Sequence, residues 1–204
     1  MRIAIFFLLV IAISSCKKDD VQTPESTPTP PGEIFPNFVN SDPKSEFFIE
    51  AEYNGKKICL STQNSSIDTF SNVYYYYPAT GQDQLNLIRE NKERSAQMQI
   101  YIGQSMMLFT KLPYSVPNDH LVFCEFTQFQ FYDEGSRHGT ENGPNDNYTY
   151  QASTNTGMKM TVTSFVDNIL EGSFEGTLRT NTGRTMEVKN GSFRIRLYIK
   201  TGDY

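Results

Sequence analysis

Hydrophobic and polar residues alternate with a period of two along most of the chain after about residue 45. Residues 47–52 read Phe-Phe-Ile-Glu-Ala-Glu, and residues 158–163 read Met-Lys-Met-Thr-Val-Thr. Because successive side chains of a strand point to opposite faces, this pattern predicts β-strands with one buried and one exposed face. Further strands are predicted over 56–62, 73–77, 85–88, 96–102 and 121–132, and the segment 89–94 fits a short helical turn.

Turn signals separate these segments and sharpen the C-terminal part of the pattern. Asn54-Gly55 places two residues that tolerate positive φ where a type I′ hairpin needs them. The blocks 172–178 and 191–197 share the pattern Gly-Ser-Phe-x-x-x-Leu, whose apolar residues fall on one face. With turns at 167–168, 180–183 and 190–191, they predict an antiparallel meander of about four strands.

The whole pattern predicts an all-β fold of about eight to ten antiparallel strands. We expect a two-sheet β-sandwich, and the alternative is a partly closed, lipocalin-like β-barrel. The composition agrees, because 15 Phe and 12 Tyr among 204 residues favour strands. This length suits one domain of ordinary size.

The first residues have the features of a secretion signal. Arg2 precedes the unbroken apolar run Ile3–Ile13, which is shorter than the roughly 20 residues that span a bilayer. The run Ile13-Ser14-Ser15-Cys16 resembles a bacterial lipobox, and the alternative is an ordinary cleaved signal with a chance cysteine. The resemblance implies cleavage before Cys16, with fatty acids such as palmitate on its thiol and amino group. Stable attachment to a membrane needs about two lipid chains, and a lipoprotein of this kind carries two or three, so these lipids would anchor the protein firmly.

Residues 17–44 have the composition of a tether. They contain six of the 10 prolines, with serines and threonines between them. Such a stretch cannot bury enough apolar area to fold and favours extended polyproline II. We therefore divide the chain into a signal peptide (1–15), a lipidated cysteine with a Pro/Thr-rich tether (16–44) and a single β domain (45–204).

A short charged cluster, Lys17-Lys18-Asp19-Asp20, follows the predicted lipid site. It resembles the surface-export signal of Bacteroidetes-type lipoproteins, and a solvated charged stub is the alternative. The segment 48–56 and the blocks 172–178 and 191–197 resemble the hairpin and closing strands of a loosely defined group of such lipoproteins of unknown function. The resemblance implies an outer-membrane lipoprotein, exposed at the cell surface or facing the periplasm.

Charge and motif content exclude several classes of function. The net charge is -5 and the isoelectric point is about 5.1, so binding to nucleic acid is not expected. The glycine motifs of nucleotide sites and the Gly-x-Ser-x-Gly motif of hydrolases are absent. Only His120 and His138 are present, which leaves no zinc motif and argues against a catalytic cysteine. We therefore expect a non-catalytic protein without a cofactor.

The run Tyr74-Tyr75-Tyr76-Tyr77 is the most unusual local feature. In a strand, Tyr74 and Tyr76 share one face and Tyr75 and Tyr77 share the other. Exposed tyrosines can stack on sugar rings and donate hydroxyl hydrogen bonds, so all four are candidate ligand-binding residues. The alternative is an ordinary sheet in which tyrosine spans the core and the water.

Two more sets of residues are candidates. In the polar segment 133–147, Asp133, Glu134 and Asp146 offer oxygen ligands for Ca²⁺, although the spacing fits no EF-hand and a solvated loop is the alternative. Cys59 and Cys124 would lie outside the inner membrane, either joined in a disulfide or as two buried free thiols.

The expected function is binding at the cell surface. We expect a module, anchored in the membrane through Cys16, that binds a glycan or a partner protein. One alternative is a structural subunit of an envelope complex, which predicts an exposed sheet edge. The other is a small lipocalin-like carrier or hydrolase, which predicts a deep pocket.

Overall fold

Two crossing layers of β-strands make up the protein. Its structure is a computed structural model that describes residues 41–63, 72–103, 111–116, 127–133, 149–153, 157–181 and 183–202. Within these residues lie twelve strands and no helix. The front layer holds β1 (Phe48–Tyr53), β2 (Lys56–Leu60), β6 (Tyr114–Val116), β9 (Met158–Val166), β10 (Ile169–Arg179) and β11 (Thr185–Arg196). The rear layer holds β3 (Val73–Tyr77), β4 (Gln82–Glu90), β5 (Ala96–Gly103), β7 (Thr127–Asp133), β8 (Thr149–Ser153) and β12 (Tyr198–Thr201).

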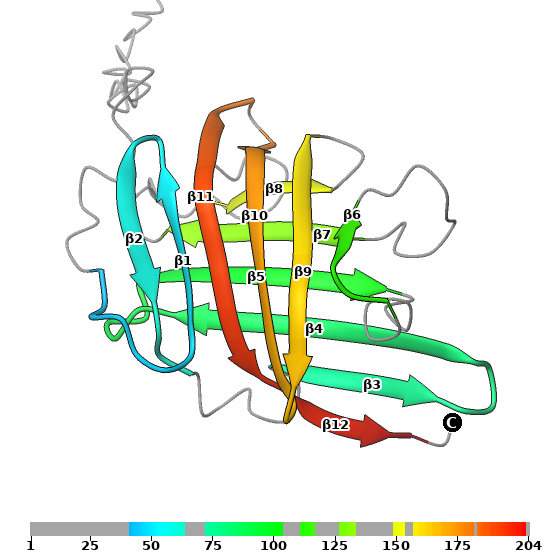
Figure 1. The fold of residues 1–204 in the computed structure, drawn as a ribbon. Coiled ribbons are helices and arrows are strands. Elements are labelled where there is room, and N and C mark those ends of the chain that lie inside the picture. Colours follow the sequence, from blue (N-terminus) through cyan, green and yellow to red (C-terminus); the bar gives the residue numbers. More distant parts are fainter. Residues whose placement is uncertain are drawn as a thin grey trace, which may run out of the picture.

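Both layers belong to one strongly curled sheet (Figure 1). The strand order is β12-β3-β4-β5-β7-β8-β10-β11-β1-β2, with β9 paired to β10 and β6 paired to β9. The sheet passes from one layer to the other where Gln151 of β8 pairs with Arg179 of β10. A bridge between Thr62 and Glu90 joins the layers at a second place, with both N–H···O distances at 2.9 Å. The expected all-β fold is confirmed, and its form is a half-barrel between the sandwich and the partly closed barrel.

The last strand departs from the predicted C-terminal meander. Strands β9, β10 and β11 pair antiparallel in sequence order, as predicted. After Leu197, however, the chain enters the rear layer, where β12 pairs parallel with β3 and Tyr198 lies beside Val73. The predicted meander of about four strands is a meander of three, because residues 185–196 form the single strand β11, and β12 pairs elsewhere. Alternation within a strand does not reveal which strand lies beside it, so this pairing could not be seen in the pattern.

Aromatic side chains from both layers fill the space between them. Tyr53 of β1 meets Phe131 of β7 with ring centroids 4.5 Å apart, and Phe129 of β7 meets Phe174 of β10 at 6.0 Å. None of these four side chains is more than 3% exposed. Burying an aromatic or large aliphatic side chain contributes about 1.5–3 kcal/mol. Such contacts between β1, β7 and β10 therefore hold the two layers together.

The two Gly-Ser-Phe blocks pair with each other across β10 and β11. Gly172 lies opposite Phe193, and Phe174 lies opposite Gly191. A Cβ atom on Gly191 would lie 2.4 Å from the carbonyl oxygen of Phe174 and 2.8 Å from its ring. A Cβ atom on Gly172 would lie 2.5 Å from the ring of Phe193. Each phenylalanine ring thus covers the glycine of the neighbouring strand, which explains the repeated block.

Hairpin turns are present at three of the four predicted places. The turn at 180–183 joins β10 to β11, and the N–H of Gly183 donates to the carbonyl of Thr180 at 3.0 Å. Asn54 and Gly55 have φ angles of 46° and 81°, which confirms the turn between β1 and β2. The chain also turns at 167–168, where both residues have positive φ. The turn predicted at 190–191 is wrong, because β11 runs through it. Asn190, with φ of 51°, lies at a β-bulge of β11, where the pairing register to β1 shifts.

The segment 89–94 is not a helical turn. Strand β4 continues to Glu90, and the side chain of Asn91 then shapes a tight turn to β5. Its Oδ1 atom accepts hydrogen bonds from the backbone N–H groups of Ser95 (2.8 Å) and Ala96 (2.9 Å). An asparagine that bonds backbone groups a few residues on stabilises a turn and competes with a helix.

Candidate binding face

The outer surface of the rear layer carries tyrosines and amides. We call the outward residues of β12, β3, β4 and β5 the tyrosine–glutamine face. Their strands pair in a continuous register, and the opposite, inward side of β4 and β5 is fully buried. Its exposed and half-buried side chains are those of Tyr198, Lys200, Tyr75, Tyr77, Gln82, Gln84, Asn86, Gln97, Gln99 and Tyr101. Val73, Ile88 and Glu90 lie on the same side of these strands but are buried.

The tyrosine run lies in β3 and is divided between the two sides of the sheet. Tyr75 and Tyr77 belong to the tyrosine–glutamine face, where their rings are nearly parallel and 6.0 Å apart. Tyr74 packs against the core on the other side. Burial, followed by the nearby Asp83 carboxylate, raises the pKa of Tyr74 far above its usual value. Of the four tyrosines predicted to bind a ligand, the structure therefore brings Tyr75 and Tyr77 together and directs Tyr74 and Tyr76 inward.

Gln84 connects the tyrosines of three neighbouring strands. Its Nε2 group donates a hydrogen bond to the hydroxyl of Tyr77 on β3 (3.1 Å). Its Oε1 atom accepts one from the hydroxyl of Tyr101 on β5 (3.0 Å). Beside this network, Gln99 Nε2 donates to Asn86 Oδ1 at 2.9 Å. Side chains fixed by their neighbours lose less entropy when a ligand binds, so the network preorganises the face.

Lys200 is the cation at the β12 end of the face. Its Nζ lies 5.4 Å from the centroid of the Tyr75 ring and 5.5 Å from that of Tyr198. It also donates a hydrogen bond to the hydroxyl of Tyr75 at 3.4 Å. The charge of Lys200 is thus directed at tyrosine rings of the same face.

The outer surface of the front layer is built from charges instead. Arg194 forms an ion pair with Glu171, and Lys189 forms one with Glu187. Opposite charges on neighbouring positions are the usual way in which a sheet face is solvated. By contrast, only Lys200 is charged among the exposed and half-buried residues of the tyrosine–glutamine face, because Glu90 on the same side is buried. The two outer surfaces of the same sheet therefore differ in chemistry.

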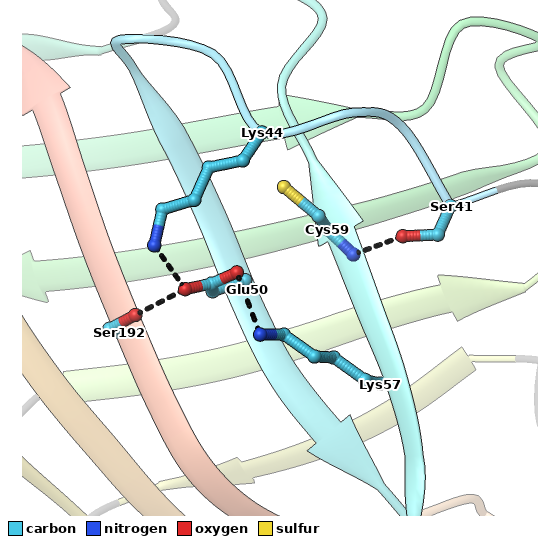
Figure 2. Close-up of polar contacts among 6 residues, drawn as sticks. All are labelled: Ser41, Lys44, Glu50, Lys57, Cys59 and Ser192. Atoms are coloured by element: carbon cyan, nitrogen blue, oxygen red, sulfur yellow. Dashed lines mark hydrogen bonds and ion pairs between the residues drawn. The ribbon is translucent and has the colours of Figure 1, made fainter.

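A polar cluster on the front layer surrounds Glu50 (Figure 2). Its Oε1 atom accepts hydrogen bonds from Lys44 Nζ (2.5 Å) and Ser192 Oγ (3.3 Å), and Lys57 Nζ lies 3.7 Å from Oε2. Burial raises the pKa of Glu50, but the two lysines and Ser192 outweigh this effect, so its pKa lies below the usual value. The partners come from β2, β11 and the segment before β1, so no local sequence signal could have shown them.

The segment 41–44, which we call the N-terminal strap, is fastened along β2. Ser41 Oγ accepts a hydrogen bond from the backbone N–H of Cys59 (2.7 Å), and the N–H of Asp42 donates to the carbonyl of Cys59 (2.9 Å). The Asp42 carboxylate accepts from the backbone N–H groups of Ser61 (3.1 Å) and Lys92 (2.9 Å). These contacts begin at Ser41, four residues before the boundary predicted at residue 45.

Cys59 is buried beneath this strap, and its thiol has no disulfide partner among the described residues. Burial, followed by the charges of Glu50 and Asp42, raises the pKa of its thiol to about 11. The thiol is therefore protonated at neutral pH and is a poor nucleophile. Cys124 lies outside the described residues, so its pairing with Cys59 stays a prediction.

Most other candidate residues lie outside the part of the chain that the structure describes. These are Cys16, Glu134 and Asp146, whereas Asp133 is the last residue of β7. No group of three or more His, Cys, Asp or Glu side chains that could hold a metal occurs within the described ranges. The Ca²⁺ site remains a prediction. A helix long and apolar enough to cross a membrane is likewise not found in these ranges.

Among the residues that the structure describes, two hollows lie on the outer surface of the front layer. The larger, of about 370 Å³, is lined by polar residues that include Lys159, Ser173 and Glu175. The smaller, of about 260 Å³, lies beside Val166 and Arg194. Neither is the deep pocket that a carrier or hydrolase needs.

Comparison with other proteins leaves the surfaces as the basis for assigning a function. The fold defines the class of the protein, an all-β chain built on one curled sheet. No known protein family, curated protein or solved structure matches the chain.

Three residues of the face, Gln84, Tyr101 and Lys200, were not among the binding residues predicted from the sequence. Residues 82–87 read Gln-Asp-Gln-Leu-Asn-Leu and residues 97–101 read Gln-Met-Gln-Ile-Tyr, so amides alternate with buried residues in both. This period of two could have placed Gln84 and Tyr101 on outer faces. The position of Lys200 depends on the parallel pairing of β12 with β3, for which the sequence holds no such signal.

Proposed function

We propose that this protein is a lipoprotein, anchored in the outer membrane through Cys16, that binds a glycan at the cell surface without catalysis. The tyrosine–glutamine face is the observation that supports binding, because it combines the parallel rings of Tyr75 and Tyr77 with the hydrogen-bonded amide of Gln84. The lipobox at Cys16 supports the anchor, and the charged residues 17–20 support the surface location.

A glycan fits this face better than a protein does. Sugar rings have apolar C–H surfaces that pack on aromatic rings, and rims of hydroxyl groups that bond amides and phenols. Protein interfaces generally have an apolar core. The exposed and half-buried residues of the tyrosine–glutamine face include no aliphatic side chain, and Val73 and Ile88 on the same side are buried.

Binding can be tested with the full-length protein purified in detergent. On an array of neutral and acidic glycans, the wild-type chain is expected to bind at least one class. The double variant Tyr75→Ala/Tyr77→Ala should lose most of this binding. The variant Phe47→Ala is the control, because it removes an aromatic ring that packs beneath Arg196, a residue of the front layer. A blank array, or equal losses in both variants, would contradict the proposal.

The anchor has a separate test. Mass spectrometry of the membrane-extracted protein should show a chain that begins at Cys16 and carries acyl groups. The variant Cys16→Ser should remain unacylated and fail to fractionate as a mature outer-membrane protein. An intact N-terminus on the wild-type chain would overturn this part of the proposal.

A second candidate function is a structural subunit of an envelope complex. It is favoured by β12, which lies at the end of the sheet and exposes 64% of Tyr198 and 43% of Ile199. Exposed edge strands can pair with another chain. This candidate predicts that the protein co-purifies from cross-linked membranes in an assembly and that Ile199→Lys releases it. Recovery of monomer alone would argue against it.

A further inference from the structure

We propose that the tyrosine–glutamine face selects uncharged glycans and that Gln84 is its central hydrogen-bonding residue. The inference rests on the proposed function and adds the class of ligand. It follows from the difference between the two outer surfaces of the sheet, from the engagement of Lys200, and from the position of Gln84.

The charge distribution argues against an acidic ligand. Carboxylate and sulfate groups of acidic glycans are held by charge-assisted bonds, above all from arginine. Arg194 and Arg196 lie on β11 in the front layer. On the tyrosine–glutamine face, the one cation is Lys200, which contacts the ring and hydroxyl of Tyr75. The face therefore lacks the paired cations that recognise an acidic sugar.

The arrangement of neutral groups matches an uncharged sugar chain. Neighbouring strands lie about 4.8 Å apart, so the face from β12 to β5 spans about 14 Å, enough for a short oligosaccharide. Tyr75 and Tyr77 offer rings on one side of β4, and Tyr101 offers a third on the other side. A glycan that lies across these strands would meet ring, amide and ring in succession.

Gln84 lies between these rings and has bonding capacity for a ligand. A carboxamide has two N–H donors and two acceptor lone pairs. Gln84 uses one donor for Tyr77 and one lone pair for Tyr101. The other donor and lone pair suit a sugar hydroxyl, which donates and accepts. The bonds to both tyrosines hold the amide in place, so Gln84 also positions the rings.

The test compares neutral and acidic glycans on the full-length protein in detergent. The neutral probes are galactomannan, dextran and hydroxyethylcellulose with an array of neutral oligosaccharides, and the acidic probes are polygalacturonate and chondroitin sulfate. We expect binding to a neutral probe that hardly changes between low and high salt, because no ion pair forms. Gln84→Leu replaces the amide with an apolar group and should weaken this binding by a few-fold to about tenfold. Phe47→Ala should bind like the wild type.

The outcomes separate this inference from the proposed function. Binding of acidic probes alone, with an affinity that falls steeply in salt, would overturn the neutral class while a glycan-binding function stands. Neutral binding that Gln84→Leu leaves unchanged, in a variant whose thermal unfolding matches the wild type, would overturn the role of Gln84. Binding of no probe at all would overturn both proposals.

Discussion

Replacing Glu50 by glutamine should destabilise the protein in a pH-dependent manner. The substitution keeps the shape of the side chain and removes the charge that faces Lys44 and Lys57. The carboxylate is 10% exposed and the lysines are 54% and 70% exposed, so each ion pair is partly screened by water. Partly exposed pairs are worth about 0.2–1 kcal/mol each, and a hydrogen bond to a charged group somewhat more. We expect a loss of about 1–2 kcal/mol in the free energy of unfolding at neutral pH.

The sign of the pH dependence follows from the lowered pKa of Glu50. A carboxyl whose pKa is lower in the folded than in the unfolded state stabilises the fold above its unfolded-state value, here the usual 4.5. This stabilisation is lost as the pH falls through the folded-state pKa. The difference between wild type and Glu50→Gln should therefore be full at neutral pH and shrink progressively below 4.5.

Urea unfolding followed by circular dichroism at neutral and acidic pH would measure this difference. Glu52→Gln is the matched control, because Glu52 lies two residues further along β1 opposite Lys57 and is more exposed. It should cost less than about 0.5 kcal/mol. A cost for Glu50→Gln that is equal at both pH values, or no larger than that of Glu52→Gln, would refute the reasoning.

Three further substitutions or modifications have defined outcomes. Asp42→Ala leaves the backbone N–H groups of Ser61 and Lys92 without their carboxylate acceptor. We expect it to lower the free energy of unfolding, measured by urea titration, by about 2–4 kcal/mol. A loss of less than half this amount would contradict the stabilising role of the strap. Gly191→Ala should lower the free energy of unfolding by at least about 3 kcal/mol, because the added Cβ would clash with Phe174. The control Gly202→Ala adds a Cβ that makes an ordinary contact, so its stability in thermal unfolding should lie within about 1 kcal/mol of the wild type. Cys59 should react with iodoacetamide at pH 8 only after denaturation, since about one thousandth of the native thiol is ionised there, and rapid native labelling detected by mass spectrometry would contradict its burial.

The fold could be predicted from the sequence as far as local pattern determines it. The strand 73–77 has the predicted bounds, and Met158, Met160 and Val162 are buried as their alternation requires. The turn at Asn54-Gly55 was also visible, because its φ angles need those residue types. Asn190-Gly191 has the same residue types but forms a bulge, since positive φ serves both structures. The neighbouring strands, and not the local sequence, decide between a turn and a bulge.

The candidate site was less predictable, because it depends on which strands lie side by side. The tyrosine run identified β3, but its partners on β4, β5 and β12 come from pairings that include one parallel contact. Glu50 and Asp42 likewise depend on residues from distant segments. The sequence signals that remain strongest, the lipobox-like run at residues 13–16 and the charged residues 17–20, concern the proposed anchor and lie outside the described structure.

The two outer surfaces of the sheet suit the two parts of the proposed function. The N-terminal strap runs along β2, and Asp42 bonds Ser61 and Lys92, so the chain enters the domain beside the front layer. That surface is rich in ion pairs, which tolerate water and a tether without offering a surface for neutral ligands. The tyrosine–glutamine face lies on the outer side of the rear layer, and the strap meets that layer at Lys92, in the turn after β4. A tether that leaves from the front layer would keep the rear face accessible while the domain is held at a membrane. The contacts of Asp42 and Glu50 would then orient the membrane-anchored domain, in addition to stabilising its fold.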